Sequence, residues 1–168
     1  MEKPELLATG RLMPLVEEGL AGEFKLHELS EARDREAFLG EISADVRCLA
    51  CNGKLMIDGA FQDRFPKLEI IANFGVGYDN IDADHAASRG IVVTNTPDVL
   101  TDEVADLAVG LMIATVREIV ASDRWLRAGH WLKSSYPLSR GTFRGKKLGI
   151  LGLGRIGNVC RWQDRQLS

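Results

Sequence analysis

Short apolar runs alternate with segments of helical periodicity along the first part of the chain. The apolar runs predict strands at residues 5–8, 24–27, 46–51, 68–73 and 91–94. Helical spacing of apolar side chains predicts helices between them, over 11–21, 31–39, 57–65 and 83–89, with Ser30 and Asp82 as N-caps. A strand–helix alternation of this kind is typical of a parallel sheet with helices on both faces.

This alternation predicts an α/β fold, in which residues 1–98 form a doubly wound, flavodoxin-like parallel sheet. Ligands of such sheets bind beyond the carboxyl ends of the strands. That rule directs attention to three loops, 52–53, 74–77 and 95–97. Each of them follows a predicted strand and contains Asn or Gly. The sequence therefore places a candidate ligand site in these loops.

A segment of different character begins at Thr101, a good N-cap followed by two acidic residues that suit the positive end of a helix. From Val104 to Val116 the segment is apolar nearly all round, so a helix there should be buried on every side. It is buried either within one domain or between a domain and a second subunit. Residues 117–143 carry the arginines and aromatic side chains that interfaces favour. The pattern therefore favours a homodimer through a helix at 101–120.

Residues 146–151 read as a strand, and Gly152-Leu-Gly-Arg-Ile-Gly157 follows directly as a G-x-G-x-x-G pattern. A strand immediately before the pattern is the context that dinucleotide binding requires. Gly152 permits the tight turn, Gly154 lets the backbone approach a pyrophosphate, and Gly157 lets the next helix pack on the strand. An ordinary strand–turn–helix in a glycine-rich chain would look the same. On the nucleotide-binding interpretation, residues 99–168 hold the dimerisation helix and the start of an incomplete Rossmann domain.

Composition narrows the classes of function. The 168 residues carry a formal net charge of -3, with 45% hydrophobic and 27% charged residues, as a folded globular protein does. A nucleic-acid partner is not expected, because binding phosphates needs a basic surface. A membrane span is not expected, because no apolar run reaches about 18 residues. The N-terminus lacks the pattern of a secretory signal, so the cytoplasm is the expected compartment.

The cysteines and histidines predict no metal or redox centre. Cys48 and Cys51 form a C-x-x-C pair, but residues three apart on a strand point to opposite faces. Two packed core cysteines are the better interpretation. Cys160 makes the number of cysteines odd, which argues against a disulfide framework. The three histidines are scattered without the spacing of metal ligands: His27, His85 and His130.

Several motifs, taken in order, resemble those of the D-isomer-specific 2-hydroxyacid dehydrogenases, and of the glyoxylate and hydroxypyruvate reductase branch in particular. The resemblance runs from about Asp45 to Gly157. It rests on the segments 74–82 (FGVGYDNID), 89–97 (RGIVVTNTP), 101–108 (TDEVADLA) and 145–157 (GKKLGILGLGRIG). In that order, they are similar to the family's substrate loop, the approach to its hinge, the start of its dimerisation helix and its phosphate loop.

The resemblance implies roles for single residues. The backbone N–H groups of Val76 and Gly77 would hold the carboxylate of a small 2-oxo or 2-hydroxy acid, since adjacent N–H groups of a turn suit an anion. A simple strand-to-helix turn is the alternative for these two residues. Val76 would also lie near the nicotinamide of NAD or NADP, and Thr101 would contact the cofactor from the hinge. The remaining cofactor-binding residues implied lie in the phosphate loop: Gly152, Gly154, Arg155, Ile156 and Gly157.

The family's chemistry requires three further side chains. An Arg polarises the substrate carbonyl, a His passes the proton and a Glu tunes that His, while the nicotinamide supplies hydride. No residue of this chain matches those positions, so no catalytic residue is assigned. The resemblance implies an NAD(P)-dependent reductase of glyoxylate or hydroxypyruvate in a C-terminally truncated form, inactive alone and prone to associate. The alternative is a non-enzymatic, dimerising flavodoxin-like module or a truncated gene product, and a frameshift is one hypothesis for the residues after Gly157.

Overall fold

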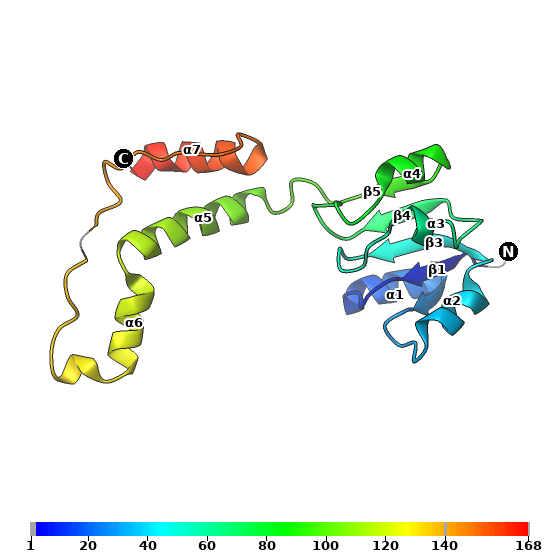
Figure 1. Cartoon of the computed structure of the whole chain (residues 1–168), viewed down its shortest axis with the longest axis horizontal. Helices are drawn as coiled ribbons and strands as arrows, with labels where there is room; N and C mark the ends of the chain where they lie inside the picture. The colour runs from blue at the N-terminus through cyan, green and yellow to red at the C-terminus, as the bar shows by residue number, and fades with distance from the viewer. Residues whose placement is uncertain (1–2, 140, 168) are drawn as a thin grey trace. The chain divides into compact units, whose positions relative to one another are not determined.

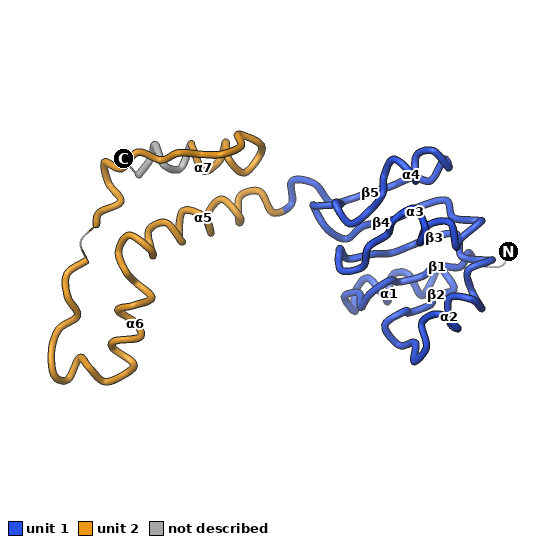
Figure 2. Tube along the Cα trace, in the orientation of Figure 1, with its two compact units in different colours: residues 1–99 blue, residues 100–168 orange. Residues whose placement is uncertain are grey.

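The computed structural model describes residues 3–139 and 141–167, with side chains in the last helix as far as Arg161. The chain divides into two compact units, residues 1–99 and 100–168 (Figure 2). The first unit contains β1 (Glu5–Ala8), α1 (Pro14–Glu23), β2 (Lys25–Glu28), α2 (Arg35–Ile42), β3 (Val46–Cys51), α3 (Gly59–Gln62), β4 (Ile70–Asn73), α4 (Ala83–Ser88) and β5 (Val92–Thr94) (Figure 1). The second contains α5 (Thr101–Val116), α6 (Ile119–Arg127), the 3-10 helix η1 (His130–Leu132) and α7 (Arg155–Leu167).

The first unit is built on a parallel sheet in the strand order β2-β1-β3-β4-β5. This is the order of flavodoxin-like doubly wound sheets, so the predicted fold class is confirmed. Helix α1 packs on one face of the sheet, where Leu12 joins Leu6 and Ala50 in a small core. Helices α2, α3 and α4 cover the other face and enclose the larger core around Leu49 and Ile71.

The alternation of side chains along β3 separates its two cysteines. Cys51 belongs to the larger core and is buried, whereas Cys48 packs against the smaller core on the α1 side. Both thiols are free, as is that of Cys160. The prediction of packed cysteines on opposite faces of the sheet is therefore confirmed.

The helix starts follow local capping chemistry. Asp82 caps α4 as predicted, because its carboxylate accepts from the His85 N–H at 2.9 Å. Ser30 was the wrong cap for α2: it lies in a turn, and Asp34 instead accepts from the N–H groups of Glu36 and Ala37 at 3.0 and 3.1 Å. Helix α1 starts at Pro14, later than the predicted residue 11, because the fixed φ of proline suits the first turn of a helix.

Helix α5 differs from the prediction in its cap and its burial. Leu100, not Thr101, is the N-cap residue, and Thr101 already lies within the helix. Ala105 and Val109 are the buried residues of α5, and the Cys160 thiol of α7 lies 3.9 Å from the Ala105 carbonyl oxygen. The described residues do not bury this helix on every side, because Leu107 is 61% and Leu111 58% exposed. They therefore do not supply burial within one domain, and burial against a second subunit stays a prediction.

The predicted strand at 146–151 is absent from the residues that the structure describes. The segment pairs with no other strand between residues 3 and 139 or between 141 and 167. An apolar sequence becomes a strand only when a neighbour accepts and donates its backbone hydrogen bonds, and the described residues of the second unit supply no such neighbour. Among the described residues, no helix is long and apolar enough to cross a bilayer.

Candidate functional site

The carboxyl ends of β3, β4 and β5 meet at one edge of the sheet, as parallel strands require. The segment 74–77, which we call the glycine loop, leaves β4 directly after Asn73. Its Phe74 N–H donates to the Cys51 carbonyl oxygen at 2.7 Å, and the Thr96 N–H donates to the Gly75 carbonyl oxygen at 3.0 Å. The glycine loop is therefore tied to the strand ends on both sides of it.

Two buried or partly buried side-chain amides hold the carbonyl groups of the glycine loop. Asn73 is 3% exposed, and its Nδ2 donates to the carbonyl oxygens of Gly75 and Gly77 at 3.3 and 2.8 Å. Asn95 follows β5 and donates from its Nδ2 to the Val76 carbonyl oxygen at 2.8 Å. Consecutive carbonyl groups of the loop are thus turned toward the protein.

The backbone N–H groups of Val76 and Gly77 have a different environment. Within residues 3–139 and 141–167, neither group donates to a protein acceptor. Val76 and Gly77 are both exposed. Two adjacent N–H groups without protein acceptors are suited to an anion such as a carboxylate. These are the two residues to which the family resemblance assigns the substrate carboxylate, and that role stays a prediction.

Cys51 contacts Asn73, the residue that directly precedes the glycine loop. The register of β3 and β4 pairs Cys51 with Asn73, and the thiol sulfur lies 3.5 Å from the Asn73 Oδ1. Burial raises the pKa of the Cys51 thiol to about 11. The thiol therefore keeps its proton at neutral pH and donates to the amide oxygen.

Two hollows open at this edge of the sheet, on either side of Thr94 and Asn95. One, of about 260 Å³, lies between α1 and the sheet and reaches Asn73, Phe74 and Thr96. The other, of about 270 Å³, is lined by Tyr78, Ala83, Val93, Thr94 and Asn95. A small ligand bound at the edge of the sheet would have room beside the loop.

The second unit carries the glycine pattern of residues 152–157. Gly152 has a φ of +93°, which L side chains rarely adopt. A Cβ atom at Gly157 would overlap the Gly152 carbonyl oxygen, whereas one at Gly154 would meet nothing within 4 Å. Arg155 and Ile156 form the first turn of α7, where the N–H groups of a helix point outward along its axis. A turn with an open approach at a helix N-terminus fits a pyrophosphate.

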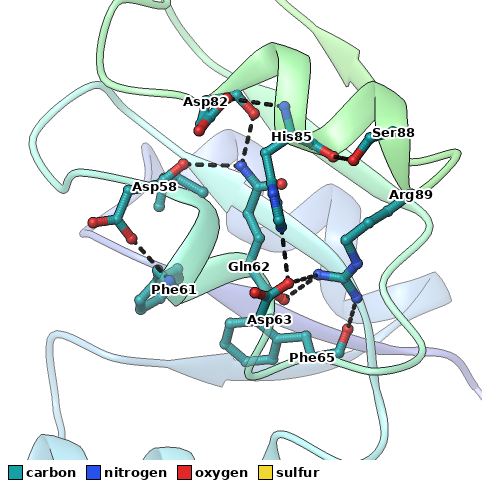
Figure 3. Close-up of polar contacts among 10 residues, drawn as sticks. Asp58, Phe61, Gln62, Asp63, Phe65, Asp82, His85, Ser88 and Arg89 are labelled. Atoms are coloured by element: carbon teal, nitrogen blue, oxygen red, sulfur yellow. Dashed lines mark hydrogen bonds and ion pairs between the residues drawn. The ribbon is translucent and has the colours of Figure 1, made fainter.

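The histidines lie in structural contacts. His27 Nε2 lies 2.8 Å from Glu5, and the ring of His130 packs on Trp125 at a centroid distance of 4.7 Å. His85 Nε2 lies 2.8 Å from the Asp63 carboxylate, in the α3–α4 contact that Figure 3 shows. None of the three contacts involves a residue of the glycine loop or of the glycine pattern at 152–157. In the part of the chain that the structure describes, no cluster of His, Cys, Asp or Glu is suited to a metal ion.

The sequence pattern indicates the glycine loop and the loop that contains Asn95, but it does not show that Asn73 and Cys51 hold the glycine loop. Asn73 and Cys51 become partners only through the register of β3 and β4. One signal was present: Asn73 is a polar residue at the end of an otherwise apolar run. A buried amide at a strand end needs hydrogen-bond partners, and the loop that follows is the nearest source of them.

The comparisons with known proteins agree with this geometry. Residues 8–158 match the catalytic domain of the D-isomer specific 2-hydroxyacid dehydrogenases. Glyoxylate reductase of Pyrococcus horikoshii is 41% identical over 164 residues, which cover 94% of this chain and 49% of that protein. Hydroxyphenylpyruvate reductase of Plectranthus scutellarioides is 39% identical over 157 residues, covering 94% of this chain and 50% of that protein.

Solved structures give the same result. The 2-hydroxyacid dehydrogenase of Ketogulonicigenium vulgare superposes with a TM-score of 0.88 at 42% identity, covering 99% of this chain and 52% of that one. The NADPH-dependent glyoxylate/hydroxypyruvate reductase of Sinorhizobium meliloti, solved with NADP and malonate, gives 0.86 at 43% identity, covering 98% and 51%. The chain spans about half the length of these relatives. Since the family match includes both glycine segments, the chain belongs to the D-isomer specific 2-hydroxyacid dehydrogenases.

Proposed function

We propose that the glycine loop binds the carboxylate of a small 2-oxo or 2-hydroxy acid, such as glyoxylate or hydroxypyruvate and their reduced forms. The observation that carries this proposal is the adjacent pair of N–H groups at Val76 and Gly77, for which the described part of the chain supplies no acceptor. Hydrogen bonds from backbone N–H groups to a carboxylate are charge-assisted and short. The names of the relatives, which include glyoxylate reductases, support this substrate class.

Calorimetric titration tests this substrate class. Glycolate, the alcohol that reduction of glyoxylate yields, is titrated into the chain beside ethylene glycol, which lacks the carboxylate. Glycolate should bind and ethylene glycol should not, because only the former carries the negative charge that the N–H pair recognises. Equal binding of the two, or binding of neither, contradicts the proposal.

The second unit is proposed to hold NAD or NADP, as the first part of a nucleotide-binding domain at 99–168 beside a substrate domain at 1–98. The open approach at Gly154 and the turn at Gly152 fit the pyrophosphate of such a cofactor, and the relative from Sinorhizobium meliloti was solved with NADP. Gly157, Arg155 and Ile156 would complete the phosphate contacts. When bound, the nicotinamide supplies hydride to the substrate carbonyl. Val76 and Thr101 are the proposed contacts outside the phosphate loop.

We also propose that residues 1–168 alone catalyse no reduction. His27 and His85 of the first unit are engaged in contacts with Glu5 and Asp63, not with the glycine loop, and His130 packs on Trp125 within the second unit. Incubation of the chain with NADH or NADPH and glyoxylate, followed by absorbance of the reduced nicotinamide, should show no oxidation above a buffer control. Steady oxidation that scales with protein concentration contradicts this part of the proposal.

The free thiols favour the cytoplasm as the compartment.

A homodimer through 101–120 is the remaining part of the proposal. Val104, Leu107 and Leu111 are exposed and spaced so that they share one face of α5. An uncovered apolar stripe of this kind favours association. Light scattering should report a dimer, and Leu107→Glu should shift it to monomer. Leu15→Glu is the matched control, since Leu15 is 77% exposed on α1 and should leave the mass unchanged; a monomeric wild type contradicts the dimer.

A further inference from the structure

The orientation of the N–H pair in the glycine loop has a structural cause. In a trans peptide unit the N–H group points opposite to the C=O group that precedes it, and the described residues contain no cis peptide bond. The Gly75 carbonyl group points to the Asn73 amide, so the Val76 N–H must point away from Asn73. The Val76 carbonyl group points to the Asn95 amide, so the Gly77 N–H must point away from Asn95.

Asn73 contributes to this arrangement at two points. Its Nδ2 donates to the carbonyl oxygens of Gly75 and Gly77 at 3.3 and 2.8 Å, and the Thr96 N–H also donates to the Gly75 carbonyl oxygen, at 3.0 Å. At 3% exposure Asn73 has little access to water that could replace these bonds. An amide hydrogen bond within the protein interior is stronger, and its loss more costly, than one at the surface.

Cys51 determines which way the Asn73 amide faces. The thiol is a donor and lies 3.5 Å from Oδ1, so it favours the orientation in which oxygen faces sulfur and nitrogen faces the loop. A flipped amide would place Oδ1 against the carbonyl oxygens of Gly75 and Gly77, where two acceptors repel. Cys51 is 1% exposed, so water has little access to the contact.

We propose that Asn73, oriented by Cys51, is a positioning residue that presets the glycine loop for carboxylate binding. The role rests on the proposed function of the loop as a carboxylate site. A loop already held in its binding conformation loses less conformational freedom when the ligand arrives. Neither residue touches the ligand; both act through the loop backbone.

The test compares Asn73→Asp with Gln62→Glu in the full chain. Both changes convert a buried amide to a carboxylate of the same shape, and the Gln62 amide also bonds two carbonyl oxygens, those of Ile57 and Asp82 at 3.0 and 2.8 Å, in the α3–α4 contact. Nitrogen-15 relaxation of residues 75–78 without ligand reports the order of the glycine loop. Asn73→Asp should lower the order parameters of these residues, whereas Gln62→Glu should leave them unchanged. Unchanged order in Asn73→Asp overturns the proposal.

Cys51 variants separate positioning from folding. Cys51→Ser keeps a donor and should retain wild-type loop order, whereas Cys51→Ala removes the donor and should loosen the loop. This pair also serves if Asn73→Asp does not fold. Equal order in the two variants overturns the role of Cys51 as the residue that orients the amide.

Glycolate affinity gives a separate readout of function. Asn73→Asp should bind glycolate about tenfold more weakly than wild type, the factor that corresponds to about 1.4 kcal/mol, and Gln62→Glu should match wild type. A wild-type chain that binds no glycolate contradicts the proposed function, and the relaxation data then still decide whether Asn73 orders the loop. Wild-type affinity in Asn73→Asp overturns the positioning role even where the loop is looser.

Discussion

Gln62 offers a sharp test of how the first unit is held together, because its buried amide is only partly satisfied. Gln62 is 0% exposed at the end of α3. Its Nε2 donates to the Ile57 and Asp82 carbonyl oxygens at 3.0 and 2.8 Å, so it joins α3 to the start of α4 (Figure 3). Its Oε1 is buried without a partner among the described residues. We consider replacement by leucine and by alanine.

The magnitude follows from what each replacement leaves behind. The Ile57 and Asp82 carbonyl oxygens keep second donors, the N–H groups of Asp82 and Ala86 at 3.0 and 3.1 Å, so neither is left unpaired. Losing the two Nε2 bonds lowers the free energy of unfolding by about 2 kcal/mol, and removing the unpaired Oε1 raises it by about 1–3 kcal/mol. Gln62→Leu, which keeps the volume, should therefore lie within about 1 kcal/mol of wild type. Gln62→Ala adds a cavity and should destabilise by about 3 kcal/mol.

Urea unfolding followed by far-ultraviolet circular dichroism measures both variants, and hydrogen exchange at the Leu49 and Ile71 amides confirms that the first unit is being reported. All three tryptophans, at 125, 131 and 162, belong to the second unit, so their fluorescence is an internal control that should not change. The reasoning fails if Gln62→Leu is destabilised as strongly as Gln62→Ala. That result would mean that the two amide bonds, rather than packing, hold this contact.

Three further predictions concern single residues elsewhere. Arg89→Lys should destabilise the first unit by about 1–3 kcal/mol, because a lysine reaches only one of the Gln62 and Phe65 carbonyl oxygens that Arg89 bonds at 2.6 and 2.9 Å. Urea unfolding measures the change, and a variant as stable as wild type contradicts the prediction. Burial raises the pKa of the Cys51 thiol from 9.0 to about 11, so the unfolded chain releases this proton at a lower pH than the folded chain. The free energy of unfolding should therefore be constant below about pH 9 and fall between pH 9 and 11, by at most about 2.7 kcal/mol. The same decline in Cys51→Ala would contradict the assignment to this thiol. Gly157→Ala should weaken NADPH binding in a fluorescence titration, since its Cβ would displace the Gly152 carbonyl oxygen, and Gly149→Ala, which meets nothing within 4 Å, should not.

Local chemistry predicted the elements of the first unit well. The alternation of β3 was enough to place Cys48 and Cys51 on opposite faces, because side-chain direction in a strand depends only on position. Asp82 was predictable as a cap because its partner, the His85 N–H, lies only three residues away in the sequence. Asp34 was missed in favour of Ser30 because both are good caps, and the choice depends on where the chain enters the helix.

Features that depend on distant partners could not be read from the sequence. The order of the glycine loop depends on the register that pairs Cys51 with Asn73, and no local pattern encodes that register. The segment 146–151 has the composition of a strand, but its pairing depends on neighbours that the described residues do not supply. The burial of α5 is likewise a property of what packs against it, which its own apolar sequence does not specify.

The central claim is that the N–H groups of Val76 and Gly77 bind a carboxylate. The most direct measurement is a titration of the nitrogen-15-labelled chain with glycolate, followed amide by amide. We expect the Val76 and Gly77 amide signals to shift the most and to saturate together, with the protons moving downfield as charge-assisted hydrogen bonds form. Shifts centred elsewhere in the chain, with these two amides unmoved, would contradict the claim.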